Sequence, residues 1–246
     1  MNLSENTVLI TGGASGIGLA LAKRFQQAGS QVIVCGRRAD KLREAQREVP
    51  GLLTRVCDVA QPAEREELLR WVQQEHPQLN VLVNNAGIQR RLQVADEEPW
   101  EVRQQEIAIN LDAPIHLCSL FVRHLQQQPR AAIINVTSGL AFTPMAIAPV
   151  YCATKAALHS FTQSLRYQLQ DTAVEVLEIV PPAVNTDLGG AGLHTFGADV
   201  NEFADSVMAR LANGEQEVGF GTSEVRRLAS RSELDAAMEA MNARFS

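Results

Sequence analysis

The stretch that decides the fold is "TGGASGIG", residues 11–18, near the start of the chain. The apolar run "TVLI" precedes it, and "GIGLALAKRFQQAG" continues it with the apolar spacing of a helix. The glycines therefore lie in a turn between a strand and a helix. The spacing G-x3-G-x-G matches neither G-x-G-x-x-G nor the lysine-bearing phosphate loop. Taken alone, the stretch is either an anion-binding loop or an ordinary glycine-rich turn.

Each glycine of this turn has a possible structural reason. Gly12 permits a tight turn, Gly16 lets the backbone approach a pyrophosphate, and Gly18 allows the helix to pack closely on the strand. The N-terminus of the following helix favours an anion. These features predict a dinucleotide site if the rest of the chain repeats the strand-helix pattern.

The pattern does repeat, because short apolar runs alternate with amphipathic segments of helical length. The runs are "TVLI", "QVIVC", "LLTRVC", "NVLVN", "AAIINVTS" and "AVEVLEIV", and the helical segments include 16–28, 39–48, 62–75 and 150–170. This alternation predicts an α/β protein: a single-domain Rossmann fold over residues 1–246, with a doubly wound, mostly parallel sheet and helices on both faces. Residues 182–200 are expected to form a long loop at the carboxyl end of a strand, where ligands bind in such sheets.

Residues 223–245 are expected to form a helical tail. Its apolar residues recur at roughly helical spacing, with charged residues between them: Val225, Leu228, Leu234, Met238, Met241 and Phe245. The tail is either a helix packed on the body of the protein or a contact between subunits.

Composition and charge narrow the classes of partner. The net charge of −6 argues against nucleic acids and anionic membranes, so we expect a small-molecule substrate or a protein partner. The N-terminus "MNLSENTVLI" has no basic segment, and no stretch reaches the roughly 18 apolar residues of a membrane span, which predicts a cytoplasmic protein. No metal site is expected, because the cysteines lack metal-ligand spacing and are interpreted as small buried apolar residues: Cys35, Cys57, Cys118 and Cys152.

The end of the second strand bears on the choice of nucleotide. A site for NAD normally has an acidic residue about 20 positions after the first glycine, to bind the ribose 2′-hydroxyl. Here "VIVCGRRADKL" places Arg37 and Arg38 directly after the strand, and no acidic residue occurs before Asp40. Two guanidiniums at this point favour the 2′-phosphate of NADP(H). The alternative is a solvated start to the next helix.

Two further strands end in small or polar residues. "LLTRVC" is followed by Asp58 and Val59, and "VLVNNAG" ends in Asn85, Ala86 and Gly87. Parallel strands bring these endings to the same edge of the sheet as the glycine loop. They can border an adenine and a ribose, although ordinary turn chemistry explains each one alone.

A tyrosine and a lysine lie four residues apart at the start of a predicted helix. Tyr151 and Lys155 in "YCATKAALHSF" share one helix face, and the chain has only two tyrosines and three lysines, so a chance match is rare. A nearby ammonium lowers the pKa of a phenol, which makes it a better acid-base group near neutrality. Ser138 closes a neighbouring strand, where it either polarises a carbonyl oxygen or forms a local turn. Asn110, by pattern alone, caps or kinks a helix boundary.

With these residues assembled, the sequence resembles a classical short-chain dehydrogenase/reductase from about residue 5 to about 220. The resemblance rests on "TGGASGIG", "NNAG", the Ser138, Tyr151 and Lys155 set with Asn110 upstream, and "PPAVNT". Within the family, "VIVCGRRADKL", "NNAGIQ" and the tail look most like the branch named after the DltE oxidoreductase, which fixes no substrate.

The resemblance implies an NADP(H)-dependent oxidoreductase that interconverts a ketone or aldehyde and an alcohol. It implies that Tyr151 donates the proton, Ser138 orients the carbonyl, Lys155 holds the nicotinamide ribose and lowers the tyrosine pKa, and Asn110 supports a water relay. The cofactor-binding residues that it predicts are Gly12, Ser15, Gly16, Ile17, Gly18, Arg37, Arg38, Asp58, Val59, Asn85, Ala86, Gly87, Tyr151, Lys155 and Thr186. A competing hypothesis is a non-catalytic NADP(H)-binding sensor or assembly subunit.

Three points lie outside the motifs. Pro182 stands where the family usually has glycine, which stiffens the loop. The family implies a homodimer or homotetramer through the helices near 112–127 and 150–170, which Ala153, Ala156 and Ala157 would allow to approach closely. We expect an apolar wall on the substrate side, formed by Leu140, Phe142, Met145 and Ile147. Arg90 and Arg91 either bind an acidic group of the substrate or belong to a solvated loop.

Overall fold

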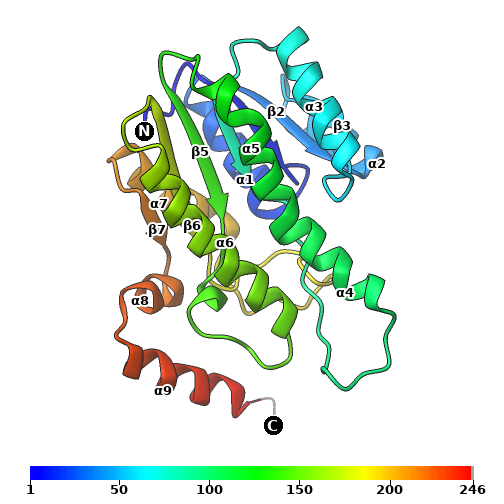
Figure 1. The fold of residues 1–246 in the computed structure, drawn as a ribbon, viewed down its shortest axis with the longest axis vertical. Helices are drawn as coiled ribbons and strands as arrows, with labels where there is room; N and C mark the ends of the chain where they lie inside the picture. The colour runs from blue at the N-terminus through cyan, green and yellow to red at the C-terminus, as the bar shows by residue number, and fades with distance from the viewer. Residues whose placement is uncertain (245–246) are drawn as a thin grey trace.

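The computed structural model describes residues 1–244, and these contain a seven-stranded sheet in the order β3-β2-β1-β4-β5-β6-β7 (Figure 1). Every neighbouring pair of strands is parallel. The strands are β1 (Thr7–Thr11), β2 (Gln31–Gly36), β3 (Leu53–Val56), β4 (Val81–Asn84), β5 (Ala131–Val136), β6 (Val174–Val180) and β7 (Glu217–Gly219).

Helices follow the strands in the alternating order that the sequence predicts. They are α1 (Gly16–Gln27), α2 (Ala39–Glu48), α3 (Pro62–Glu75), α4 (Trp100–Ile107), the π-helical turn η1 (Ala108–Asp112), α5 (Ala113–Leu125), the 3₁₀ turn η2 (Gly139–Ala141), α6 (Pro149–Gln168), α7 (Val200–Ala212), α8 (Thr222–Leu228) and α9 (Arg231–Asn242). The predicted α/β Rossmann architecture with a parallel sheet is confirmed.

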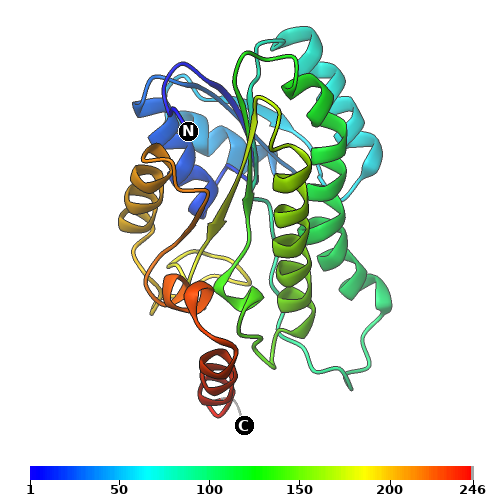
Figure 2. The same cartoon turned by 60° about the vertical axis from the view of Figure 1, so that its left-hand side comes forward.

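The sheet lies between two layers of helices (Figure 2). Every residue of β1 and of β5 is buried, as a strand covered on both faces requires. One apolar core packs α1 and α7 against the sheet and includes Phe25 and Val207. The other lies under α3, α5 and α6 and includes Leu117, Phe121 and Leu165. The sheet therefore has an apolar core on each of its two faces.

The strand order reverses between β1 and β4. Strands β2 and β3 extend the sheet on one side of β1, and β4 to β7 extend it on the other. In open parallel sheets, ligands bind outside the carboxyl ends of the strands at such a reversal. The glycine loop after β1 and the "NNAG" segment after β4 both begin at this point.

The tail differs from the single helical segment predicted for residues 223–245. It forms two helices, α8 and α9, because Ser230 begins a new helix with a capping box in which its backbone N–H donates to Glu233 at 2.7 Å. Val225 is 69% exposed, Leu228 is 67% exposed, and none of the residues of α9 is buried. The tail still contacts the body, because Asn242 accepts from the Ala146 amide at 2.7 Å and donates to the Pro144 carbonyl oxygen at 3.0 Å, so the choice between a packed helix and a subunit contact stays open. Phe245 lies outside the described residues.

Two expectations from composition can be compared with the structure. All four cysteines are free and buried, which confirms their interpretation as small core residues. Across residues 1–244, none of the helices combines the length and the apolar character that crossing a membrane requires.

Candidate active site

The glycine loop leads directly into α1. Gly12 and Gly16 have φ values of +63° and +53°, a left-handed conformation that favours glycine. Ser15 is the N-cap residue of α1, but its side chain forms no capping hydrogen bond. The first amides of the helix therefore point out of the loop without a side-chain acceptor, which is the arrangement that binds an anion.

The loop is also packed so closely that side chains are excluded from it. A Cβ on Gly12 would lie 2.8 Å from Ala86 Cα, and a Cβ on Gly18 would lie 2.6 Å from the Gly12 carbonyl oxygen and against the Asn85 amide. A Cβ on Gly16 would lie 3.3 Å from Thr186 Cγ2. Side chains at these positions would fill the space beside the helix N-terminus, so the loop fits the pyrophosphate of a dinucleotide.

The "NNAG" segment supports this loop through polar contacts. The side-chain amide of Asn85 donates to the carbonyl oxygens of Thr11 at 2.9 Å and Gly12 at 3.2 Å. The hydroxyl of Thr11 accepts from the backbone amides of Asn85 and Ala86, both at 3.0 Å. Asn85 thus fixes the glycine loop with its side chain, and Ala86 lies against Gly12.

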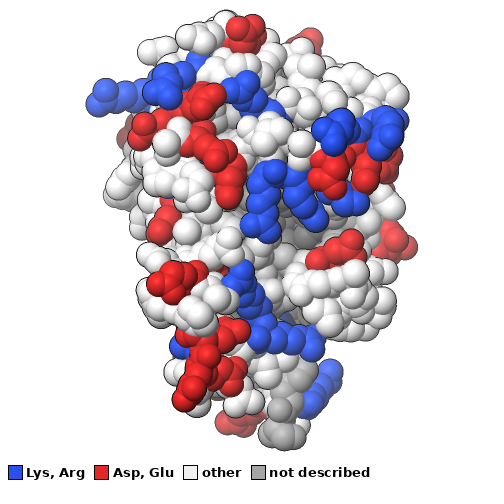
Figure 3. Space-filling model, turned by 90° about the vertical axis from the view of Figure 1, so that its right-hand side faces the viewer, with Lys and Arg blue, Asp and Glu red and all other residues white. Residues whose placement is uncertain are grey.

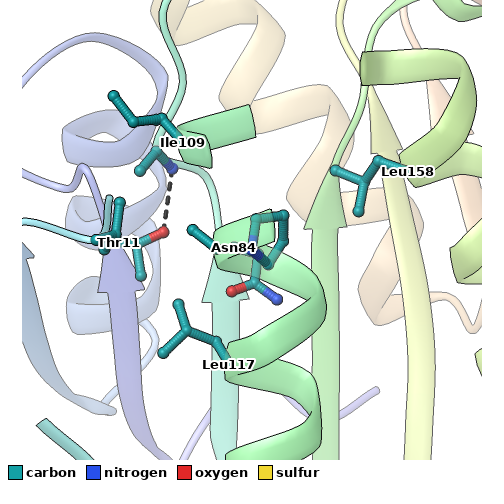
Figure 4. Close-up of a pocket in the computed structure, with 9 residues that line it drawn as sticks. Thr11, Asn84, Ile109, Leu117 and Leu158 are labelled. Atoms are coloured by element: carbon teal, nitrogen blue, oxygen red, sulfur yellow. Dashed lines mark hydrogen bonds between the residues drawn. The ribbon is translucent and has the colours of Figure 1, made fainter. Parts of the chain in front are cut away.

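Figure 4 shows a small pocket below this segment, with Thr11, Asn84, Ile109, Leu117 and Leu158 around it. Asn84 Nδ2 donates to Asn135 Oδ1 at 2.9 Å, and Asn135 Nδ2 donates to Thr162 Oγ1 at 2.9 Å. This buried chain of amides connects β4, β5 and α6. It fixes the relative positions of the strands whose carboxyl ends carry the site residues.

The two residues after β3 differ in their surroundings. The Asp58 backbone amide donates to the Glu64 carboxylate at 2.7 Å, and the Asp58 carboxylate accepts from the Ala60 amide at 3.0 Å. Asp58 therefore makes the local turn contacts that its position alone explains. Val59 is buried and lines the pocket of Figure 4.

Arg37 and Arg38 follow β2 and are exposed. Arg38 is the N-cap residue of α2, and within residues 1–244 neither guanidinium has a hydrogen-bond or ion-pair partner. Two unpaired cations at the carboxyl end of β2 are free to bind an anion.

The predicted catalytic residues come from three elements. Asn110 lies in η1, the π-helical turn between α4 and α5, and such turns often occur at functional sites. Lys155 lies on α6, where its Nζ donates to the Val136 carbonyl oxygen at 2.8 Å. A Cβ on Gly87 would lie 3.4 Å from Asn110 Oδ1 and 3.7 Å from Lys155 Nζ. Gly87, in the segment after β4, thus lies against both side chains.

Tyr151 and Ser138 complete the group. Both are buried, and hydrogen bonding to Ser138 lowers the pKa of the tyrosine. Ser138 lies after β5 as the N-cap residue of η2, and its Oγ accepts from the Leu140 amide at 3.1 Å. Lys155 Nζ lies 5.7 Å from the centroid of the Tyr151 ring. The structure therefore brings together all four residues that the sequence singled out.

The electrostatics of the tyrosine differ from the sequence-based expectation. Burial raises the pKa of Tyr151 above its ordinary value, and this exceeds the lowering by Ser138. Burial also lowers the pKa of Lys155 to about 8, while Glu106 and Glu178 oppose that change. In this structure burial of the phenol therefore dominates its pKa, and the lowering of the tyrosine pKa by Lys155 stays a prediction.

The comparisons with known proteins agree with this geometry. The family model for short chain dehydrogenases matches residues 6–194. The chain belongs to the short-chain dehydrogenase family. An uncharacterized oxidoreductase, DltE of Bacillus subtilis (strain 168), is 48% identical over 248 residues, which cover 98% of each chain. An uncharacterized oxidoreductase of Staphylococcus epidermidis is 31% identical over 81% of this chain and 84% of its own length.

Solved structures of short-chain dehydrogenases show the same fold. A short-chain dehydrogenase from Burkholderia cenocepacia J2315 in complex with NADP has a TM-score of 0.84 at 24% identity and covers 97% of this chain and 99% of its own. The closed form of a serine dehydrogenase in complex with NADP+ has a TM-score of 0.78 at 28% identity. The match covers 87% of this chain and 94% of the serine dehydrogenase chain. The predicted resemblance to this family and to its DltE branch is confirmed.

In this short-chain dehydrogenase the two arginines after "NNAG" are not equivalent. Arg90 is engaged with α4, since its guanidinium donates to the Val102 carbonyl at 2.8 Å and to Gln105 Oε1 at 2.5 Å. Arg91 is exposed; burial, and after it the charge of Arg91, lowers the pKa of His194 in the loop between β6 and α7. Arg90 is therefore held by α4, whereas Arg91 acts on the loop between β6 and α7, and recognition of an acidic group by either arginine stays a prediction.

The substrate side of the site consists of loops. Residues 181–199, between β6 and α7, form the predicted long loop, in which Val184 and Ala198 make an isolated β-bridge. The loop approaches the segment after β4 closely, because a Cβ on Gly189 would lie 3.1 Å from the Gln89 carbonyl oxygen. Pro182 is accommodated after Pro181, whose carbonyl oxygen accepts from the Gly139 amide at 2.9 Å. The predicted apolar wall is half-buried, and Phe142 packs edge-on against His159. In the view of Figure 3, Lys and Arg side chains gather around a hollow near the middle of the molecule.

The sequence analysis missed Glu106. This residue lies in α4, one turn before Asn110, and is completely buried. In "WEVRQQEI" it resembles the solvated glutamates around it, and no local signal distinguishes it. Only the spacing of four residues to Asn110 places it on the same helix face.

Proposed function

We propose that this short-chain dehydrogenase reduces a ketone or aldehyde to an alcohol, or catalyses the reverse oxidation, with NADP(H). The observation that carries the proposal is the assembly of Tyr151, Ser138, Lys155 and Asn110 at one edge of the sheet, beside the glycine loop. A purely structural or binding role would not require a buried phenol next to a buried ammonium.

Each side chain has a separate role in this proposal. The Tyr151 hydroxyl donates a proton to the carbonyl oxygen of the substrate, and the Ser138 hydroxyl holds the same oxygen by a hydrogen bond. The raised pKa of Tyr151 keeps the phenol protonated in the direction of reduction. Lys155, as an ammonium, stabilises the phenolate that remains, and Asn110 orders the path by which the proton is restored. When bound, NADPH supplies the hydride that the carbonyl carbon takes up.

The residues that would hold the cofactor extend along the carboxyl edge of the sheet. The proposed pyrophosphate contacts are the amides of Ser15, Gly16 and Ile17 at the start of α1, and the proposed 2′-phosphate contacts are Arg37 and Arg38. Asp58, Val59, Ala86 and Thr186 would border the remainder of the dinucleotide. The likeness to a serine dehydrogenase complexed with NADP+ supports the choice of NADP(H).

The test is a panel of aliphatic, aromatic and acidic ketones and aldehydes, incubated with the purified protein and either NADPH or NADH. We expect oxidation of NADPH with at least one carbonyl compound, and the corresponding alcohol by mass spectrometry. Tight binding of NADPH without turnover of any compound would favour the competing hypothesis, a non-catalytic sensor or assembly subunit.

We further propose that residues 1–246 form a single domain that assembles as a homodimer or homotetramer. The exposed face of α6 carries small residues, among them Ala153 and Ala156, which would permit close approach of a second copy. Light scattering after size exclusion measures the molar mass, and a value equal to the 26.9 kDa of one chain would contradict the assembly.

A further inference from the structure

Glu106 is a buried carboxylate with an incomplete set of hydrogen bonds. Its side chain is 0% exposed. Oε1 accepts from the Arg90 backbone amide at 3.1 Å, whereas Oε2 is buried and has no hydrogen-bond partner within residues 1–244. Burial of a charged group that is only partly hydrogen-bonded is costly, so a nearby opposite charge has a large influence on it.

The groups that face Glu106 come from two other segments. Arg90, in the segment after β4, contributes its amide and its charge, and Lys155 on α6 contributes an ammonium. Tyr151 and Cys152, also on α6, are the other titratable groups on which the charge of Glu106 acts. Burial raises the pKa of Glu106 to about 7, while Arg90 and Lys155 lower it.

Glu106 in turn acts on the pKa of Lys155. Burial lowers the pKa of Lys155, and the charge of Glu106 is the largest effect that opposes this, followed by that of Glu178 on β6. Among residues 1–244, the Val136 carbonyl oxygen is the one hydrogen-bond acceptor of this ammonium. Without a carboxylate nearby, a buried lysine is readily deprotonated.

Glu106 and Asn110 also act on the same segment of backbone. Asn110 accepts from the Ile88 amide at 2.9 Å and donates to the Ile88 carbonyl oxygen at 2.8 Å, and Glu106 accepts from the Arg90 amide two residues later. The two side chains lie one turn apart on the helix, through α4 and η1. This helix face therefore holds the segment after "NNAG". It also packs on α6, where the Asn110 amide donates to Thr154 Oγ1 at 3.3 Å, one residue before Lys155.

We propose that Glu106 is a positioning residue whose carboxylate keeps Lys155 in its ammonium form. The inference rests on the proposed function, in which Lys155 acts as an ammonium. Above the pKa of Lys155 the charge is lost, and reductase activity falls. Removal of the Glu106 charge lowers that pKa further, so the basic limb of the pH profile of kcat moves to lower pH.

The test compares Glu106→Gln with the wild type. The glutamine retains an oxygen that can accept from the Arg90 amide, so the substitution removes the charge and keeps the structural contact. We expect the basic limb to shift downward by about 1 pH unit. Glu106→Asp retains a carboxylate, so its basic limb should lie closer to that of the wild type. Glu101→Gln changes an exposed residue of the same helix and should leave the basic limb where it is in the wild type. An unchanged limb in a folded Glu106→Gln variant that binds NADPH would overturn the proposal.

A second readout requires no activity. The protein is labelled with ¹³C at its glutamate carboxyl groups and titrated by NMR. The Glu106 resonance is assigned as the one that is absent in Glu106→Gln. The midpoint of its titration should be near pH 7. Lys155→Met removes the ammonium and should raise that midpoint. An equal midpoint in both proteins would overturn the coupling between Glu106 and Lys155. If the wild type reduces no carbonyl compound, the proposed function fails, and this titration still decides the coupling.

Discussion

The cofactor side and the substrate side of the sheet edge are built differently. On the cofactor side, β1, α1 and the segment after β4 are so closely packed that Gly12 and Gly18 have no room for a Cβ, and Asn85 ties the segments together. On the substrate side, loops, the start of α4 and the tail helix α8 expose large apolar residues: Val94 and Phe196, each 75% exposed, Trp100, Val225 and Leu228. A ligand with a fixed phosphate geometry constrains the backbone, whereas a variable substrate does not.

The largest expected effect concerns the nucleotide phosphate. The double variant Arg37→Ala, Arg38→Ala should weaken NADPH binding by about 10- to 100-fold and leave NADH binding unchanged, because only NADPH has the charged group that these guanidiniums would contact. Titration followed by nicotinamide fluorescence gives both Kd values. Arg43→Ala, which changes an exposed arginine within α2, is the matched control. Equal losses for both nucleotides would remove the 2′-phosphate assignment.

The next prediction concerns the close packing of the glycine loop, which a stability measurement can test. Gly18→Ala should lower the free energy of unfolding by roughly 2 kcal/mol, because the new methyl group meets the Gly12 carbonyl oxygen and the Asn85 amide. Gly36→Ala is the control, since nothing lies within 4 Å of a Cβ at that position. Urea denaturation measures both. Equal stability of the two variants would mean that the loop can shift and is not closely constrained.

The third pair of variants separates two neighbouring arginines on the substrate side. Arg90→Ala should cost about 1 kcal/mol of stability, because it breaks the contacts of Arg90 with Val102 and Gln105. Arg91→Ala should leave stability unchanged and raise KM for acidic carbonyl substrates only. Thermal unfolding and steady-state kinetics distinguish the two. A similar rise in KM for neutral substrates would exclude Arg91 from recognising acidic groups.

The smallest effect depends on pH. The hydrogen bond to buried Glu178 raises the pKa of His159 above its ordinary value of 6.5. A raised pKa in the folded protein means that the stabilisation is complete below pH 6.5 and is lost as pH rises through the folded-state pKa. His159→Gln should therefore be more destabilising at pH 5.5 than at pH 9, by on the order of 1 kcal/mol. His76→Gln, whose ring packs on Trp71, serves as the control. A difference that does not change with pH would contradict the ion pair.

Much of the fold and of the cofactor side could be predicted from the sequence, for physical reasons. Buried parallel strands require continuous apolar runs, and the turn after β1 requires glycine at Gly12 and Gly16, whose φ values are positive. Tyr151 and Lys155 were recognisable because a helix fixes the spacing of two residues on one face.

The remaining features depend on tertiary packing. Glu106 looks like a surface glutamate in its own helix and becomes buried only because the segment after β4 and helix α6 cover it. The raised pKa of Tyr151 has the same origin, since burial exceeds the local effect that sequence spacing suggests. The break in the tail came from the capping box at Ser230, which a pattern of apolar residues does not register.

The central claim is that Tyr151 performs proton transfer in a protein that binds NADPH. The most direct measurement compares the wild type with Tyr151→Phe in a single-turnover reaction, in which enzyme with bound NADPH is mixed with excess carbonyl substrate and nicotinamide fluorescence is followed. We predict equal NADPH affinity and a rate that is about 10³-fold lower in the variant. A variant that oxidises NADPH at the wild-type rate would contradict the account.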